Sequence, residues 1–285
     1  MSTVPIYGYW YEQSRERGDD HAEREAGESL YWQALTGAIG RLRPNIELRL
    51  DGHSREGIYF ANYAVAIQGL STIRAFHSKG AIPWESANTL MSALASLPSL
   101  ENVTLSFGHE ERPAVAGEFK GLKNLLKSRS LQSIEFSKFN FTSGVRRALL
   151  AAFEEGSFVT NLRFTDCYRR YEVEDQTGAI RALVQALQRN VLVKTLSLVG
   201  NDFNELFCEG ITTVLLVNTT LEGLTLSKRT DGIEDGGRWL QPLFVAMRIN
   251  TSLKSLDVDT FHLTDGFVCR ALREMFANNS VLLSL

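Results

Sequence analysis

The feature that most constrains the fold of this chain is the hexapeptide pattern L-x-x-L-x-L, which recurs along most of its length. If the fourth position of each copy is taken as a marker, neighbouring markers are 25 to 34 residues apart. Sustained self-similarity at such a period indicates a solenoid, in which each repeat packs mainly against its neighbours. The markers are Leu48, Ile73, Val103, Ile134, Leu162, Leu196, Leu224, Leu256 and Leu285.

Each unit combines a short strand with a helix. The pattern alternates apolar and variable positions, as a strand with one buried face does. A helical stretch follows, as in residues 203–218, where apolar side chains recur three and four positions apart. We predict an α/β solenoid over residues 45–285, with about nine units and the last one truncated, so that the chain resembles a fragment of a longer protein. A charged and aromatic tail over 1–28 and a capping helix over 29–44 precede it.

The repeats resemble the leucine-rich repeat family, specifically its ribonuclease-inhibitor-like subtype. The resemblance implies a horseshoe with parallel strands on the concave face and helices on the convex face. It also implies that Cys167 and Asn201, which stand three residues beyond the last strand leucine, form hydrogen bonds to neighbouring backbone. The other units carry different residues there, so we expect irregular bends in them: His53, Ser78, Gly108, Phe139, Arg229 and Phe261.

A second repeated position lies six residues before the markers of the last units. It is occupied by Ser128, Gly156, Asn190, Asn218, Asn250 and Asn279. Gly and Asn both tolerate the left-handed conformation that ends a helix, which predicts a helix-terminating turn. Two of these asparagines also match the glycosylation pattern N-x-[ST], but the start of the sequence shows no secretory signal. We therefore interpret the position as structural.

Composition narrows the class of protein further. The 285 residues include 44% hydrophobic and 22% charged residues, with a net charge of −3 and a pI near 6.0. Such a balance does not favour binding to nucleic acid or to anionic membranes. Three cysteines are too few for a disulfide framework, and no apolar run is long enough to span a membrane. We expect a cytoplasmic protein.

Motifs for catalysis are missing from the sequence. The five histidines have no H-E-x-x-H spacing, the cysteines are not paired, and no phosphate-binding G-x-x-x-x-G-K-[ST] loop occurs. Cys167 is better explained as a bend residue than as a nucleophile. We therefore expect no enzymatic activity, no cofactor, no metal site and no small-molecule substrate.

The strand side chains that face solvent form the first candidate binding surface. The central column is predicted to contain Arg49, Arg74, Thr104, Glu135, Arg163, Ser197, Thr225 and Asp257. The next column is predicted to contain Asp51, Phe76, Ser106, Ser137, Thr165, Val199, Ser227 and Asp259. We expect the charged members of the first column, together with Phe76 and Asp259, to contact a partner. The alternative is a solvated sheet face without a partner.

Long loops supply the second candidate. From Val103 onward long and short units alternate, and the extra residues fall after the strand in every second unit. The three loops would then project from one edge of the solenoid. The middle loop contains Tyr168, Arg169, Arg170 and Tyr171, residue types that are enriched in interface hot spots. We expect this loop to contact a partner, whereas the outer two loops fit solvated insertions.

The expected function is therefore a non-enzymatic protein–protein interaction module. Two alternatives remain open. Ran GTPase-activating proteins share the repeat subtype and act through an arginine near the first units, for which Arg49 and Arg74 are candidates by location. The sensing region of a larger NOD-like receptor is the other.

Overall fold

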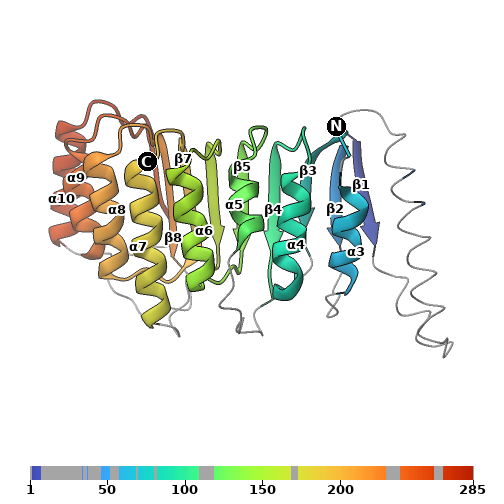
Figure 1. Cartoon of the computed structure of the whole chain (residues 1–285). Helices are drawn as coiled ribbons and strands as arrows, with labels where there is room; N and C mark the ends of the chain where they lie inside the picture. Colours follow the sequence, from blue (N-terminus) through green and yellow to red (C-terminus); the bar gives the residue numbers. More distant parts are fainter. Residues whose placement is uncertain are drawn as a thin grey trace.

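The computed structural model of this chain describes residues 2–7, 34, 37, 46–51, 58–68, 70–79, 82–108, 119–167, 173–228, 238–259 and 266–284. Within these ranges one sheet of nine parallel strands follows the chain order, β1 to β9 (Figure 1). The strands are β1 (Ser2–Tyr7), β2 (Ile46–Asp51), β3 (Ile73–Ser78), β4 (Asn102–Ser106), β5 (Ser133–Ser137), β6 (Asn161–Thr165), β7 (Thr195–Asn201), β8 (Gly223–Lys228) and β9 (Ser255–Asp259).

Helices alternate with the strands from β2 onward and form a second layer in front of the sheet in Figure 1. Each helix contacts the next one in the chain, as the strands do. The prediction of an α/β repeat structure with parallel strands is therefore confirmed. The helices are α3 (Ile58–Ile67), α4 (Trp84–Ala95), α5 (Lys120–Leu126), α6 (Ser143–Glu154), α7 (Val173–Arg189), α8 (Glu205–Val217), α9 (Gln241–Met247), preceded by the short helix η1 (Arg238–Leu240), and α10 (Gly266–Asn278).

The core is a continuous apolar layer between the sheet and the helices. In β4 and β5 the second and fourth residues are buried while the residues between them remain partly exposed. The marker residues Val103, Ile134 and Leu162 are at most 2% exposed. One face of the sheet is therefore covered and the other is accessible.

None of the helices among the described residues is long and apolar enough to cross a membrane.

The phase of β3 differs from the prediction. Phe76, and not Ile73, pairs with Leu48 on one side and with Val103 on the other. A register shift between Ile46 and Glu47 accommodates one extra residue of β3, Arg74. Phe76 is 0% exposed and its ring lies 5.9 Å from that of Tyr63. The prediction that Phe76 faces solvent is wrong, because this strand buries both Ala75 and Phe76.

The outer side of β2 is occupied by a strand that we did not predict. Residues Ser2–Tyr7, at the start of the predicted tail, form β1 and pair in parallel with β2 over six residues. Of the predicted capping helix, the structure describes Ala34 and Gly37, which are helical. β2 thus has both of its edges paired, which protects it from pairing with other chains.

The repeated asparagines join neighbouring units through their side chains. Asn218 Nδ2 donates to the carbonyls of Leu187 (2.7 Å) and Asn190 (3.1 Å) in the preceding unit, and its Oδ1 accepts from the backbone N–H groups of Thr220 and Leu221. Asn250 and Asn279 make the same kind of bridge. The structural interpretation of these positions is supported, because Asn218 and Asn250 are 6% and 7% exposed.

The prediction that these asparagines adopt the left-handed conformation at the end of a helix is wrong. Asn218 has φ −82° and ψ 128°, an extended conformation and not a left-handed one. Only Gly156 at this position adopts a positive φ, of 95°, and there the neighbouring Ser157 hydroxyl donates to the carbonyl of Leu126. Asparagine is therefore favoured by its paired donor and acceptor, which satisfy buried backbone groups of two units at once.

The bend after the strand also contains the hydrogen bonds that the resemblance implies. Asn201 Oδ1 accepts from the N–H of Cys167 at 2.8 Å, and Asn201 Nδ2 donates to the carbonyl of Phe164. The Cys167 thiol in turn contacts the carbonyl of Phe136 at 3.2 Å and accepts from the N–H of Phe139. The implied role of Cys167 and Asn201 is thus confirmed.

Phe139 occupies the same bend position and stabilises it differently. It is 2% exposed and lies in an aromatic cluster, with ring centroids 4.6 Å from Phe136, 4.8 Å from Phe107 and 5.3 Å from Trp84. Aromatic pairs at such separations are stabilising beyond the area they bury. At this bend, ring packing thus takes the place of the hydrogen bonds that Asn or Cys makes elsewhere.

Candidate protein-binding surface

The accessible face of the sheet presents aligned columns of side chains. From β4 to β9 the predicted central column is confirmed, since Thr104, Glu135, Arg163, Ser197, Thr225 and Asp257 are register partners in succession. The second column is in register over the same strands and ends at Asp259. Asp257 and Asp259 are both exposed on β9.

The column departs from the prediction at β3. His77, and not Arg74, stands between Arg49 and Thr104. This is the consequence of the register shift that buries Phe76. Arg74 remains exposed and its guanidinium lies 3.4 Å from the carboxylate of Glu101. Arg49 and Arg74 are therefore not neighbours in one column.

A polar network surrounds His77. The carboxylate of Glu47 lies 2.7 Å from Arg49 and 3.5 Å from His77 Nε2, while His77 Nδ1 is 3.0 Å from the hydroxyl of Thr104. Burial lowers the pKa of His77 below 6.5, and the charge of Arg49 acts in the same direction, against the opposing effect of Glu47 and Glu135. His77 is thus fixed by two neighbours and favours its neutral form.

A second network lies at the centre of the column. Arg163 Nε donates to Thr165 Oγ1 at 3.3 Å and lies 3.3 Å from Glu135 Oε1, and the Thr165 hydroxyl donates to the same carboxylate oxygen at 3.0 Å. These contacts link strands β5 and β6 and hold the side chains of a half-exposed surface in place. Such fixed polar groups bind a partner at a lower entropic cost than mobile ones do.

The geometry argues against Cys167 as a nucleophile. Burial raises the pKa of its thiol to about 12, so that the reactive thiolate is disfavoured. Its sulfur contacts the backbone of Phe136, Thr165 and Phe139. Among the residues that the structure describes, no three His, Cys, Asp or Glu side chains are grouped to hold a metal. The structure thus assigns Cys167 to the bend.

The predicted contact loop with Tyr168, Arg169, Arg170 and Tyr171 lies outside the described residues, which end at Cys167 and resume at Val173. Most of the two outer loops also lies outside them. The role of the Tyr-Arg-Arg-Tyr loop therefore stays a prediction. Its flanking strand β6 carries Arg163 and Thr165, so the loop follows the strand at the centre of the polar network.

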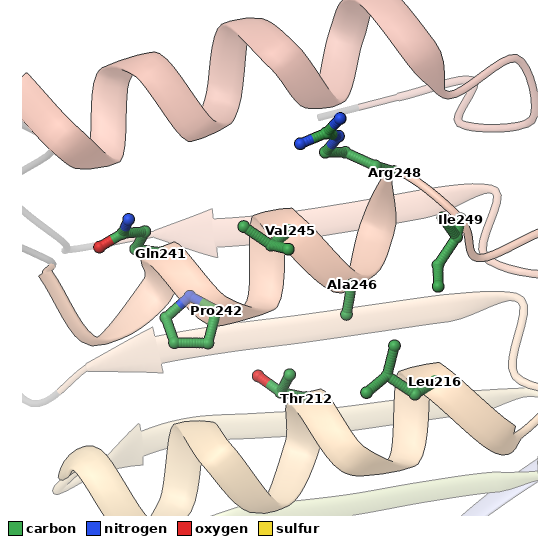
Figure 2. A pocket seen from close by; sticks show the side chains of 8 residues that line it. All are labelled: Thr212, Leu216, Gln241, Pro242, Val245, Ala246, Arg248 and Ile249. Carbon is green, nitrogen blue, oxygen red and sulfur yellow. The ribbon is translucent and has the colours of Figure 1, made fainter.

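Sequence reasoning missed a second surface, on the helical side of the molecule. Leu216, Val245 and Ile249 are 39–70% exposed, together with Val191, Leu192, Val217 and Phe276. Of these, Leu216, Val245 and Ile249 border a groove of about 560 Å³ between α8 and α9 (Figure 2). A signal was present in the run "VLLV" over residues 214–217, because four consecutive apolar residues of a helix cannot all face one core.

Comparison with models of known protein families and with curated proteins finds no match to this sequence. The candidate surfaces therefore stand on the geometry of this chain alone.

Proposed function

We propose that the chain is a protein-binding module of the leucine-rich repeat type, in its ribonuclease-inhibitor-like form. In this proposal the sheet is the concave face of a horseshoe, the helices form its convex face, and a cytoplasmic protein partner lies across the accessible side of the strands.

The observation that carries the proposal is the register of the accessible face. Six successive strands, β4 to β9, place hydroxyl-bearing or charged side chains opposite one another in the central column, and one ion pair, between Arg163 and Glu135, fixes two of them. An extended array of preformed hydrogen-bonding groups suits a protein surface better than it suits a small molecule, which is usually bound in an enclosed, mostly apolar pocket.

The test compares two single substitutions of the same kind on opposite sides of the molecule. Ser197→Arg places a long charged side chain at the centre of the column, and Thr213→Arg places one on the exposed side of α8. Partners captured from the native source by the unmodified chain are identified and purified, and their affinities for both variants are measured by calorimetry. We expect Ser197→Arg to weaken binding at least about tenfold, as loss of a central contact does, and Thr213→Arg to leave it unchanged.

Equal affinities for Ser197→Arg and the unmodified chain would show that the sheet face is not the binding surface. The loop contribution is separated by Tyr168→Ala together with Arg170→Ala. This double variant should weaken the same complex if the loop contacts the partner, and an unchanged affinity would exclude that contact.

A further inference from the structure

Most carboxylates on the strand side of the molecule are neutralised by cations of the same chain. On the accessible face, Glu47 lies 2.7 Å from Arg49, and Glu135 lies 3.3 Å from Arg163. Just before the strands, the same holds for the ion pairs Arg74–Glu101, Lys194–Glu222 and Lys254–Glu222. Charges that are paired in this way offer a partner little net charge to recognise.

Asp257 on β9 departs from this pattern. It is exposed in the central column, and its carboxylate makes no hydrogen bond or ion pair within the part of the chain that the structure describes. Its register partner on β8 is Thr225, and its neighbours on the same side of β9 are Ser255 and Asp259. None of these three neighbours is a cation. The β9 end of the face thus carries a negative charge that no described neighbour compensates.

The side chains beside Asp257 leave room for a partner. In the central column, Ser197 on β7 and Thr225 on β8 separate Arg163 from Asp257. Neighbouring strands lie about 4.8 Å apart, so that the two charged residues stand about 14 Å apart along the column. Both side chains between them are short and carry hydroxyl groups. A partner segment can therefore approach the strands closely here and place a side chain beside Asp257.

We propose that the protein partner places an arginine side chain against Asp257, so that this residue selects a basic segment of the partner. The inference rests on the proposed function, because it requires the partner to lie on the sheet face. A carboxylate accepts two parallel hydrogen bonds from a guanidinium, and the neighbouring Thr225 hydroxyl is an acceptor for a further donor. The lysine ammonium lacks this planar arrangement of donors, so lysine binds less tightly.

Peptides from a random library displayed on phage serve as the probes. The library is selected on the full chain, and the peptides that no longer bind the Ser197→Arg variant are kept, because these bind the sheet face. We expect them to be enriched in arginine. In one such peptide the arginine is then replaced by lysine or by citrulline, which has nearly the same shape without the charge. Fluorescence anisotropy should show the tightest binding for arginine and about tenfold weaker binding for citrulline, with lysine between them.

Two protein variants assign the effect to Asp257. Asp257→Asn removes the charge and keeps the size of the side chain, so it should weaken binding of the arginine peptide about tenfold and leave the citrulline peptide unchanged. The matched control Glu209→Gln neutralises an exposed carboxylate on α8, on the helical side, and should leave both affinities unchanged. Unchanged thermal midpoints confirm that both variants are folded.

The possible failures are distinguishable. Sheet-face peptides without enrichment of arginine, or an arginine peptide that binds Asp257→Asn as tightly as the unmodified chain, would overturn the inference and leave the proposed function intact. Binding that is lost when calcium is chelated would also overturn it, because Asp257 would then hold a metal ion. A selection that yields no peptide sensitive to Ser197→Arg would contradict the proposed function, and the inference would fall with it.

Discussion

The bridge made by Asn218 allows the joint between units to be tested quantitatively. Its side chain satisfies three buried backbone groups, namely the carbonyls of Leu187 and Asn190 and the N–H of Leu221. Leaving a buried donor or acceptor without a partner costs about 1–3 kcal/mol. Asn218→Ala should therefore lower the free energy of unfolding by about 3–5 kcal/mol, after partial relief by water at the turn.

Asn218→Gly separates this reasoning from a role in left-handed backbone. If the position required a positive φ, glycine would be tolerated or even stabilising. Because Asn218 has φ −82° and acts through its side chain, we expect Asn218→Gly to cost at least as much as Asn218→Ala. The matched control is Asn278→Ala, which removes an exposed hydrogen bond to the carbonyl of Glu274 within α10 and should change stability by no more than about 0.5 kcal/mol.

Urea unfolding followed by far-UV circular dichroism measures all three variants. The slope m must stay unchanged, because repeat arrays can lose cooperativity and unfold in parts. A loss below about 1 kcal/mol for Asn218→Ala, or a neutral Asn218→Gly, would refute the view that the side chain joins the units through buried hydrogen bonds.

Three further predictions follow. Phe139→Ala should lower the free energy of unfolding by about 3–5 kcal/mol in urea titrations, because it opens a cavity in the aromatic cluster. The control Phe158→Ala, at an exposed ring, should have little effect. Similar losses for the two variants would contradict the ring-packing account. The pKa of His77, measured by NMR, should lie below 6.5. Its contribution to stability is therefore present above pH 6.5 and is lost as the pH falls towards the folded-state pKa. A measured pKa above 6.5 would contradict this prediction. The regulator alternative is tested by measuring GTP hydrolysis by a small GTPase in the presence of the purified chain. Acceleration that is lost in Arg49→Ala or Arg74→Ala would favour this alternative, and no acceleration would count against it.

The sequence predicted most of the sheet correctly where each strand has a single possible phase. From β4 to β9 the apolar markers are separated from other apolar residues by polar ones, so that Val103, Ile134 and Leu162 can face only the core. In β3 the sequence offers both Ile73 and Phe76. They are three residues apart, and the hydrogen bonds to β2 and β4 select between the two phases.

The amino-acid pattern by itself determined the architecture, since one strand and one helix cannot cover their apolar sides without neighbouring units. It also identified Asn218 and its equivalents as a joint, but the reason depends on carbonyls of the preceding unit, about thirty residues away. The exposure of Leu216 and Ile249 is likewise decided by which sides of α8 and α9 their neighbours cover. Local spacing thus determines each unit, whereas contacts between units decide which groups are satisfied and which remain free for a partner.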